Sequence, residues 1–314
     1  MLFRGAELSE LPPVDAQQRV GELRAAVARR LRLSADRVAL RLGAARLEDD
    51  ARSLASYGAG DAAAVEAKDL GPQFSYRGVF IIEYAGPIVI VLAAALRLLP
   101  PPLADLLLPA PEFAPLDLAG ALRGGLAAPD GSREWSRGVQ ALGVLLWVLH
   151  FAKRELETLF VHKFSRKTMP LANLWRNCAY YWLFAAFVAL PLCSSRYTAP
   201  PRAVVLPALL AWCLAQAANL AVHLQFAFAR GAEGDRSRAP PGGPLFALVT
   251  SPNYSAEVAG WAAWTALTHV AAGGLFTLVG LAQMTQWALQ KHAGYAKGDP
   301  AYARARKAIV PFII

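Results

Sequence analysis

The chain has 314 residues, of which 55% are hydrophobic and only 18% are charged, and its net charge is +9. Soluble domains carry about 25% charged residues, so this composition and the mean hydropathy of +0.32 favour an integral membrane protein. The basic residues lie mainly in short loops between apolar runs. This pattern is typical of cytoplasmic loops and explains the positive charge without a nucleic-acid partner.

The three cysteines, Cys178, Cys193 and Cys213, lie in or beside apolar segments and lack metal-ligand spacing. We therefore expect small buried side chains, neither a disulfide framework nor a zinc site, and no bound metal. No basic stretch followed by an apolar core opens the chain, so we expect no cleavable signal peptide.

Residues 1–70 differ from the rest and predict a small α+β domain. Apolar residues recur at helical spacing in residues 20–31, and residues 38–42 alternate as in a half-buried strand. Residues 64–67 could form a closing strand. The order of helix, strand, LEDDARSLASYG and strand resembles the second half of a ubiquitin-like β-grasp, although residues 1–13 mark the opening hairpin poorly. A generic α+β appendage is the alternative.

Residues 71–314 contain about six apolar segments, and we expect about six transmembrane helices because roughly 20 residues cross a bilayer. The segments are residues 79–99, a short span or interfacial piece within 104–126, and residues 139–152, 177–192, 203–228 and 258–289. The helix from 139–152 is expected to continue into KRELETLFVHKF. The last segment has 32 residues, too many for one straight crossing and too few for two full ones with a turn. Gly273 and Gly274 near its middle predict a break, a kink or a re-entrant pair there.

Basic residues cluster in residues 153–176, 230–238 and 291–307. If the positive-inside rule holds, all three clusters lie on the cytosolic side together with the N-terminal domain. The C-terminus then also lies in the cytosol.

Two sequence blocks carry a resemblance to a known family. SPNYSAEVAGW from Ser251 and QKHAGYAKGDPAYARARKAIVPFII from Gln290 closely resemble the C-terminal domain of the steroid 5α-reductase family, within residues 151–314. LETLFVHKFS from Leu156, followed by TMPL from Thr168, resembles its very-long-chain enoyl-CoA reductase branch, whose members also carry a ubiquitin-like head. The resemblance implies an all-α polytopic membrane bundle, residues 71–314, preceded by a small α+β ubiquitin-like domain.

The activity implied by this resemblance is reduction of very-long-chain trans-2,3-enoyl-CoA to saturated acyl-CoA with NADPH, the last step of fatty-acid elongation. The implied location is the endoplasmic reticulum membrane, with other elongation enzymes as partners. No Gly-x-Gly-x-x-Gly follows a strand, so we expect NADPH to bind within the bundle or at its mouth. The fatty tail would lie between helices, and the CoA among cytosolic basic loops.

Glu83 is the first candidate catalytic residue, because a carboxylate inside an apolar span is costly unless it is paired or faces a cavity. In the family a glutamate early in an N-terminal transmembrane helix faces the substrate, and EYAGP resembles the enoyl-CoA reductase version. An interfacial glutamate near the headgroups is the alternative. We expect Tyr84 on a different helix face, where it could be an aromatic anchor at the interface.

His162 is the second candidate, since it occupies the position of an active-site tyrosine in the steroid-reducing members and histidine can donate a proton near neutral pH. A structural histidine at a helix end is the alternative. Glu157 is five residues away and is expected to point elsewhere, whereas Thr158 shares a helical face with His162. Four residues are expected to line the same cavity: Asn173, Asn177, Tyr180 and Tyr181.

Asn219, His223 and Arg230 follow at the end of one span, and the first two share a helical face. In the family this segment carries an asparagine, a polar residue and an arginine that hold the nucleotide. Ala227 stands where animal enoyl-CoA reductases keep another arginine, which weakens the phosphate-binding assignment. Taken alone, a histidine such as His223 is more often a helix residue with a structural hydrogen bond than a ligand.

The PNY block implies that Asn253 and Glu257 contact the nicotinamide nucleotide, as in the family. Tyr254 and Glu257 lie three residues apart and are expected on one face, pointing into the bundle. We favour Tyr254 as proton donor to the substrate α-carbon, with His162 and Glu83 polarising or positioning the substrate. A tyrosine at the membrane interface is the alternative.

The tail supplies two further candidate cofactor residues, His292 and Tyr295, because basic and hydrogen-bonding groups at a helix end suit a phosphate-bearing ligand. Compared with the family, the stretch around Lys297 is simplified. Three other functions stay open: a 3-oxo-5α-steroid or polyprenol reductase, a catalytically inactive membrane scaffold of the same fold, and an isoprenylcysteine methyltransferase, which the EYAGP and LETLF blocks disfavour.

Overall fold

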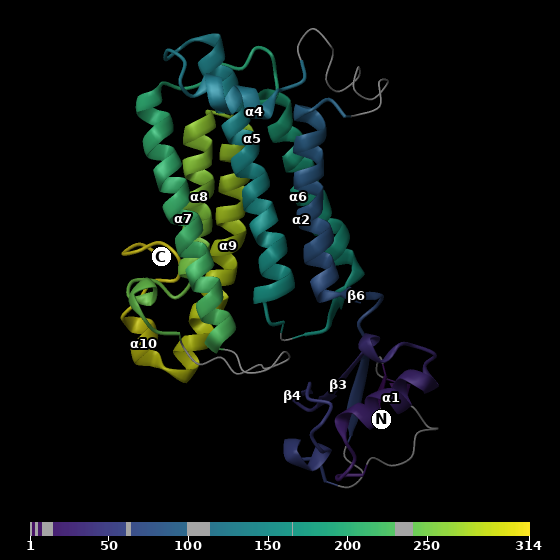
Figure 1. The fold of residues 1–314 in the computed structure, drawn as a ribbon. Coiled ribbons are helices and arrows are strands. Elements are labelled where there is room, and N and C mark those ends of the chain that lie inside the picture. Colours follow the sequence, from purple (N-terminus) through teal and green to yellow (C-terminus); the bar gives the residue numbers. More distant parts are fainter. Residues whose placement is uncertain are drawn as a thin grey trace. The chain divides into compact units, whose positions relative to one another are not determined.

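The structure is a computed structural model that describes residues 2–3, 6–7, 15–60, 64–98, 114–164, 166–229 and 241–314. The chain forms two compact units (Figure 1). The first comprises Met1–Tyr76 with Lys167–Trp175, and the second comprises Arg77–Arg166 with Arg176–Ile314. The first unit therefore extends beyond residue 70 and includes a short segment from the middle of the chain.

A five-stranded sheet with the order β2-β1-β5-β3-β4 forms the first unit, with β1 parallel to β5 and the other neighbours antiparallel. Its strands are β1 (Leu2–Phe3), β2 (Ala6–Glu7), β3 (Val38–Leu42), β4 (Ala45–Leu47) and β5 (Val65–Asp69). Helix α1 (Val20–Arg30) buries Leu23 and Val27 in one core with Leu40 of β3. The predicted helix and both predicted strands are confirmed.

The TMPL block forms a strand of its own. β7 (Thr168–Pro170) pairs antiparallel with β6 (Gln73–Ser75), and helix α6 begins directly after β7. This pairing explains why the middle segment belongs to the first compact unit.

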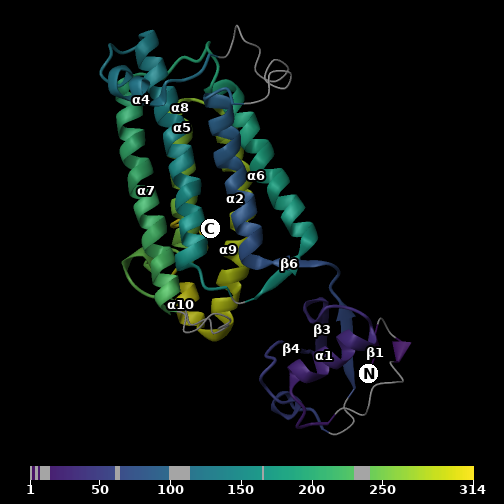
Figure 2. The same ribbon diagram turned by 45° about the vertical axis from the view of Figure 1, so that its right-hand side comes forward.

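Within the described ranges, six long helices make up most of the second unit and lie side by side (Figures 1 and 2). They are α2 (Tyr76–Ala95), α5 (Arg133–Leu156), α6 (Leu171–Leu192), α7 (Arg202–Ala229), α8 (Pro252–Thr268) and α9 (Ala271–Gly298). Shorter helical pieces are α4 (Leu118–Gly120), η3 (Ala121–Gly125), η4 (Glu157–Val161), η5 (Pro244–Phe246) and α10 (Pro300–Arg304). The expected continuation of α5 into the LETLF block is confirmed, because η4 follows it without interruption.

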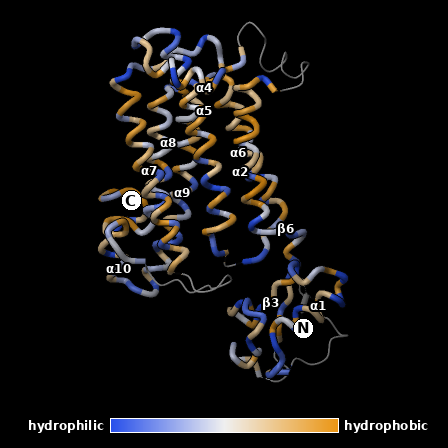
Figure 3. The backbone as a smooth tube through the Cα atoms, in the orientation of Figure 1, coloured by the Kyte–Doolittle hydropathy of each residue, from blue (hydrophilic) through white to orange (hydrophobic). Residues whose placement is uncertain are grey.

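Aromatic rings fill the interior of this bundle. Trp147 of α5 lies 5.0 Å from Trp261 and 5.3 Å from Trp264, both of α8, and 5.8 Å from Phe276 of α9, measured between ring centroids. Hydrophobic colour also runs along the helices in Figure 3, and large apolar side chains of α7 such as Leu210 are exposed. Among the described residues, α2 and α7 are long and apolar enough to cross a membrane, and the expected total of about six spans stays a prediction.

Gly86 and Pro87 lie inside α2, which continues through them without interruption. A Cβ on Gly86 would lie 1.9 Å from the indole nitrogen of Trp182, so the glycine permits close packing of α2 on α6. The carbonyl of Pro87 accepts a hydrogen bond of 3.2 Å from Trp147. Packing therefore explains the conspicuous Gly-Pro pair.

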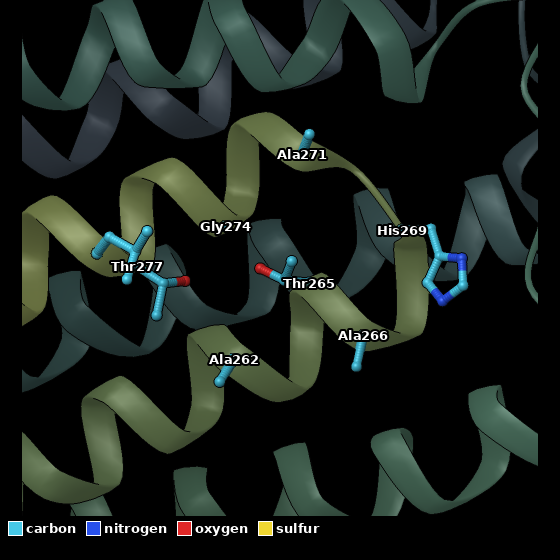
Figure 4. Close-up of a pocket in the computed structure, with 8 residues that line it drawn as sticks. Ala262, Thr265, Ala266, His269, Ala271, Gly274 and Thr277 are labelled. Atoms are coloured by element: carbon cyan, nitrogen blue, oxygen red, sulfur yellow. The ribbon is translucent and has the colours of Figure 1, made fainter.

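The predicted break in the last apolar segment exists but lies earlier than Gly273. α8 ends at Thr268, His269 adopts a left-handed backbone with φ of 53°, and α9 begins at Ala271 and continues to Gly298. The break therefore separates two helices, both of which extend beyond the apolar run of residues 258–289. Gly274 instead faces Thr265 across the pair (Figure 4), and a Cβ on Gly273 would clash with Trp264.

Candidate active site

A network of polar side chains is buried inside the helical unit. Glu83 and Glu157 are each only 1% exposed, and His150, Asn219 and His223 are also buried. These residues come from α2, η4, α5 and α7. Since burying an unpaired charge costs several kcal/mol, the network must be internally paired to be stable.

Glu157 is the centre of this network. One carboxylate oxygen lies 3.1 Å from Lys153 Nζ, and the other lies 2.5 Å from Arg154 Nη1 and 3.0 Å from His223 Nδ1. Both cations lie one turn before Glu157 on the same helix, at the spacings of three and four that bring helical side chains together. The carboxylate is therefore neutralised on both oxygens.

His162 lies close to Glu157, contrary to the expectation that a separation of five residues keeps them apart. η4 is a π-helix, and the His162 amide donates a 2.7 Å hydrogen bond to the Glu157 carbonyl, five residues earlier. In this wider turn residues five apart share a side. Ligand atoms of Glu157, His162 and His223 lie within 4.8 Å of one another, so the expected separation of Glu157 from His162 is wrong. The His162 and His223 rings also lie 5.1 Å apart.

The imidazole of His162 is half-buried and lies beyond the end of α5. Burial, assisted by the positive charge of Arg154, lowers the pKa of His162 to about 3. The ring is therefore neutral at physiological pH. It can donate one hydrogen bond through a ring N–H, but it is not charged as a general acid would be.

Tyr84 faces the bundle interior and is not an interfacial anchor. Its hydroxyl accepts a 3.1 Å hydrogen bond from Arg154 Nη2, and its ring packs 5.5 Å from that of Tyr181. Arg154 thus joins Tyr84 to Glu157. The sequence reading missed this link because it treated Arg154 and Lys153 only as loop charges that set topology.

Glu83 is deeply buried, so the reading as an interfacial carboxylate is wrong. Its Oε2 accepts a 2.7 Å hydrogen bond from Asn177 Nδ2 of α6. Asn177 is thus a partner of Glu83, and its expected place beside the same cavity as His162 stays a prediction. The Glu83 carboxylate lies on α2, the helix that also carries Tyr84.

Asn219 connects the Glu157 cluster to Glu257. Its side-chain oxygen accepts a hydrogen bond from Lys153, and its Nδ2 donates to Glu257 Oε2 at 3.1 Å and to the Asn253 carbonyl at 3.0 Å. The predicted common face of Asn219 and His223 is confirmed, because both bond to the α5–η4 segment. Arg230 lies outside the described residues.

His150 completes the network and was not recognised in the sequence. Its Nε2 lies 3.1 Å from Glu257 Oε1, and its Nδ1 lies 3.1 Å from Gln216 Oε1. Trp261 Nε1 donates to the same Glu257 oxygen at 2.9 Å. A lone histidine in an apolar run was a signal, but nothing in its spacing pointed to Glu257, 107 residues later.

Tyr254 and Glu257 contact different helices in the described part of the structure, which differs from the common face expected for them. Lys291 Nζ lies 5.0 Å from the centre of the Tyr254 ring, and Trp287 packs 6.2 Å from it, both on α9. Glu257 instead faces α5 and α7. Residues three apart on a helix differ by about 60° in direction, and α8 has neighbours on both sides.

The remaining tail candidates lie beside the start of α8. His292 Nδ1 is 3.4 Å from Thr250 Oγ1, and Tyr295 packs against Tyr302 with ring centres 5.7 Å apart. The chain after α10 returns to this point, because the amides of Thr250 and Ser251 bond to carbonyls of the segment 307–308. The tail therefore fixes the PNY block.

Two buried oxygens beside the PNY block suit a ligand that donates hydrogen bonds. Asn253 Oδ1 and Ser251 Oγ have no hydrogen-bond partner within the described ranges. Such groups are costly unless something pairs with them. A nicotinamide cofactor fits, because its carboxamide N–H groups can donate hydrogen bonds to these oxygens and to the carboxylate of Glu257.

A divalent cation fits the network less well. Ligand atoms of Glu157, His162 and His223 lie within 4.8 Å of one another, which is close enough to share an ion. Arg154 Nη1, however, lies 3.1 Å from His223 Nδ1 and holds the same carboxylate. A second cation would be repelled there. The expected absence of a metal stays a prediction.

Comparison with known proteins gives a consistent result. The family model described as 3-oxo-5-alpha-steroid 4-dehydrogenase matches residues 167–314. The chain is 40% identical to a putative enoyl-CoA reductase of Trypanosoma brucei brucei over 85% of its own length and 80% of that protein. It is 33% identical to the very-long-chain enoyl-CoA reductase of Dictyostelium discoideum, over 94% and 92% of the two chains. A probable very-long-chain enoyl-CoA reductase of Caenorhabditis elegans is 36% identical over 91% and 88%. The chain therefore belongs to the very-long-chain enoyl-CoA reductase branch of the steroid 5α-reductase family of oxidoreductases.

Proposed function

We propose that this protein reduces very-long-chain trans-2,3-enoyl-CoA to saturated acyl-CoA with NADPH, as the final step of fatty-acid elongation. The observation that carries the proposal is the continuous polar network from Tyr84 through Arg154, Glu157, Lys153 and Asn219 to Glu257, buried inside an apolar bundle. Buried ionisable groups in such surroundings are costly and are typical of functional sites. The names of the relatives supply the reaction class.

The cofactor half of the site is assigned to the Glu257 end of the network. Asn253 and Glu257 offer acceptors to the carboxamide of a nicotinamide, and Asn219 holds both in place. His223 is connected to this region because it contacts Glu157, which belongs to the same network. The more distant residues assigned to the nucleotide are Arg230, His292 and Tyr295. When bound, NADPH supplies the hydride that the β-carbon of the substrate receives.

The substrate half is assigned to the Glu83 and His162 end. A neutral His162 can donate a hydrogen bond to the thioester carbonyl, and Glu83 can position the substrate from α2. Protonation of the α-carbon completes the reduction. Tyr254 is the proposed donor, and Lys291 Nζ lies 5.0 Å from the centre of its ring. Tyr84 is the alternative donor, because it lies in the buried network.

The setting of the enzyme is proposed as follows. Six long helices with exposed leucines support a multi-pass membrane bundle of about six spans. The sheet order and the single packed helix support a ubiquitin-like β-grasp for the N-terminal domain of residues 1–70. We place the protein in the endoplasmic reticulum membrane, with both termini cytosolic and other elongation enzymes as partners.

The test is NADPH oxidation by the purified protein in nanodiscs. We expect turnover with a long-chain trans-2-enoyl-CoA and formation of one saturated acyl-CoA for each NADPH consumed. NADPH consumption only with an enone sterol or a polyprenal would move the protein to the steroid or polyprenol branch. NADPH binding without turnover of any of these substrates would instead favour the inactive scaffold.

A further inference from the structure

His150 lies in an unusual position for a histidine on an apolar helix. It is 3% exposed, and both of its ring nitrogens face acceptor oxygens, Gln216 Oε1 and Glu257 Oε1, each at 3.1 Å. Each ring nitrogen therefore lies at hydrogen-bonding distance from an oxygen on another helix.

Glu257 is held asymmetrically as a result. Oε1 receives both the His150 nitrogen and the Trp261 indole N–H, which occupy its two lone pairs. Oε2 receives only the Asn219 amide at 3.1 Å, so one acceptor position on Oε2 stays unused by these partners. The Glu257 side chain is 18% exposed whereas that of His150 is 3%, so the carboxylate is the accessible member of the pair.

The orientation of the His150 ring is fixed from three sides. Gln216 of α7 holds Nδ1, the Trp261 ring of α8 packs at a tilt 4.5 Å away, and Phe151 packs edge-on at 5.1 Å. Gly260 leaves room for Gln216, since a Cβ there would lie 3.0 Å from its amide nitrogen. Residues of α5, α7 and α8 thus fix the orientation of one imidazole.

We propose that His150 is a positioning residue for the cofactor: it fixes Glu257 so that Oε2 presents a free acceptor to an amide N–H of the nicotinamide nucleotide. This inference rests on the proposed function, because it requires that Glu257 contacts the cofactor.

The test is direct binding of NADPH to the full-length protein in nanodiscs, measured by cofactor fluorescence. His150→Phe keeps an aromatic ring against Trp261 but removes both N–H groups. Its Kd for NADPH should rise about 10-fold, the usual effect of losing a hydrogen bond to a charged group. Its KM for enoyl-CoA should stay within about 2-fold of wild type. His150→Gln, which retains one donor, should recover most of the loss.

Coupling separates positioning from a general packing role. In a Glu257→Gln background, His150→Phe should weaken NADPH binding by less than about 2-fold, since the carboxylate it serves is already absent. Tyr197→Phe is the matched control. It removes one buried hydrogen bond, to the Thr268 carbonyl at 2.8 Å, outside the network. This variant should bind NADPH as the wild type does.

Three results would overturn the inference or its basis. If His150→Phe binds NADPH as tightly as wild type while Glu257→Gln binds it more weakly, the role of His150 is refuted but the cofactor contact of Glu257 is retained. Wild-type affinity in Glu257→Gln would remove the assigned cofactor contact and with it the basis of the inference. If His150→Phe does not fold, Gln216→Leu tests the same orientation, and unchanged NADPH affinity in that variant refutes the proposal.

Discussion

Arg154 Nη1 lies 2.5 Å from Glu157 Oε2, three residues along one continuous helical segment, while Nη2 of the same guanidinium donates to Tyr84 on α2. Arg154 therefore connects a carboxylate to a phenol through a single rigid group. Lys153 and His223 are the other partners of the Glu157 carboxylate. This arrangement makes Glu157 the residue on which the network depends most.

Replacing Glu157 with glutamine should destabilise the protein strongly. The substitution leaves the buried Lys153 and Arg154 without their counter-charge, and breaking a buried ion pair from one side costs about 3–5 kcal/mol. Thermal unfolding followed by tryptophan fluorescence measures the loss. Glu134→Gln is the control, because Glu134 is exposed on the same helix and should change stability by about 1 kcal/mol or less. Equal effects of the two variants would contradict the central position of Glu157.

Two tyrosine variants decide the proton donor. Tyr254→Phe should lower kcat by about 100-fold or more while leaving the Kd for NADPH within about 2-fold, because only the proton transfer is lost. Tyr84→Phe removes the acceptor of Arg154 and should mainly lower thermal stability. Single-turnover kinetics with enoyl-CoA measures the chemical step. A large rate loss in Tyr84→Phe with an active Tyr254→Phe would assign the donor to Tyr84.

His162 should make the stability of the protein depend on pH. Its folded pKa of about 3 lies below the value of roughly 6.5 in an unfolded chain, so between these values the unfolded chain binds more protons. Acid therefore favours unfolding, and stability should fall by up to about 1.4 kcal/mol per pH unit below 6.5. Between pH 7.5 and 5.0 the Tm of the wild-type protein should fall further than the Tm of His162→Gln.

The control for this pH effect is His269→Asn. His269 is exposed in the connection between α8 and α9, and its left-handed backbone is one that asparagine adopts readily. This variant should keep the wild-type slope of Tm against pH. Parallel slopes for wild type and His162→Gln would show that His162 is not responsible.

Two glycines of α9 test the packing of the α8–α9 hairpin. A Cβ on Gly273 would lie 2.6 Å from the Trp264 ring, so Gly273→Ala should cost about 1–3 kcal/mol through overpacking. A Cβ on Gly294 would contact nothing within 4 Å, so Gly294→Ala should be neutral or stabilising by up to about 1 kcal/mol. Thermal unfolding of both variants measures the difference. A stable Gly273→Ala protein would contradict the close approach of the two helices.

Periodicity and composition predicted much of the fold. The helix at Val20–Arg30, the strand at Val38–Leu42 and the apolar helices follow from side-chain spacing that is local in the chain. The motif blocks pointed to Glu83, Asn219, His223 and Glu257, all of which lie in the buried network. A polar residue in an apolar segment can be recognised from sequence because burying it is costly in any fold.

Only the tertiary structure decided which of these residues meet. The π-helical turn brought Glu157 to His162, and the positions of α5 and α7 brought His150 and Asn219 to Glu257. Tyr254 was turned toward α9 by the same packing. Residue type and spacing determine the face of a helix on which a side chain lies. The partner of that face depends on how separate helices pack, and this is set by contacts between residues far apart in the chain, such as Gly86 with Trp182.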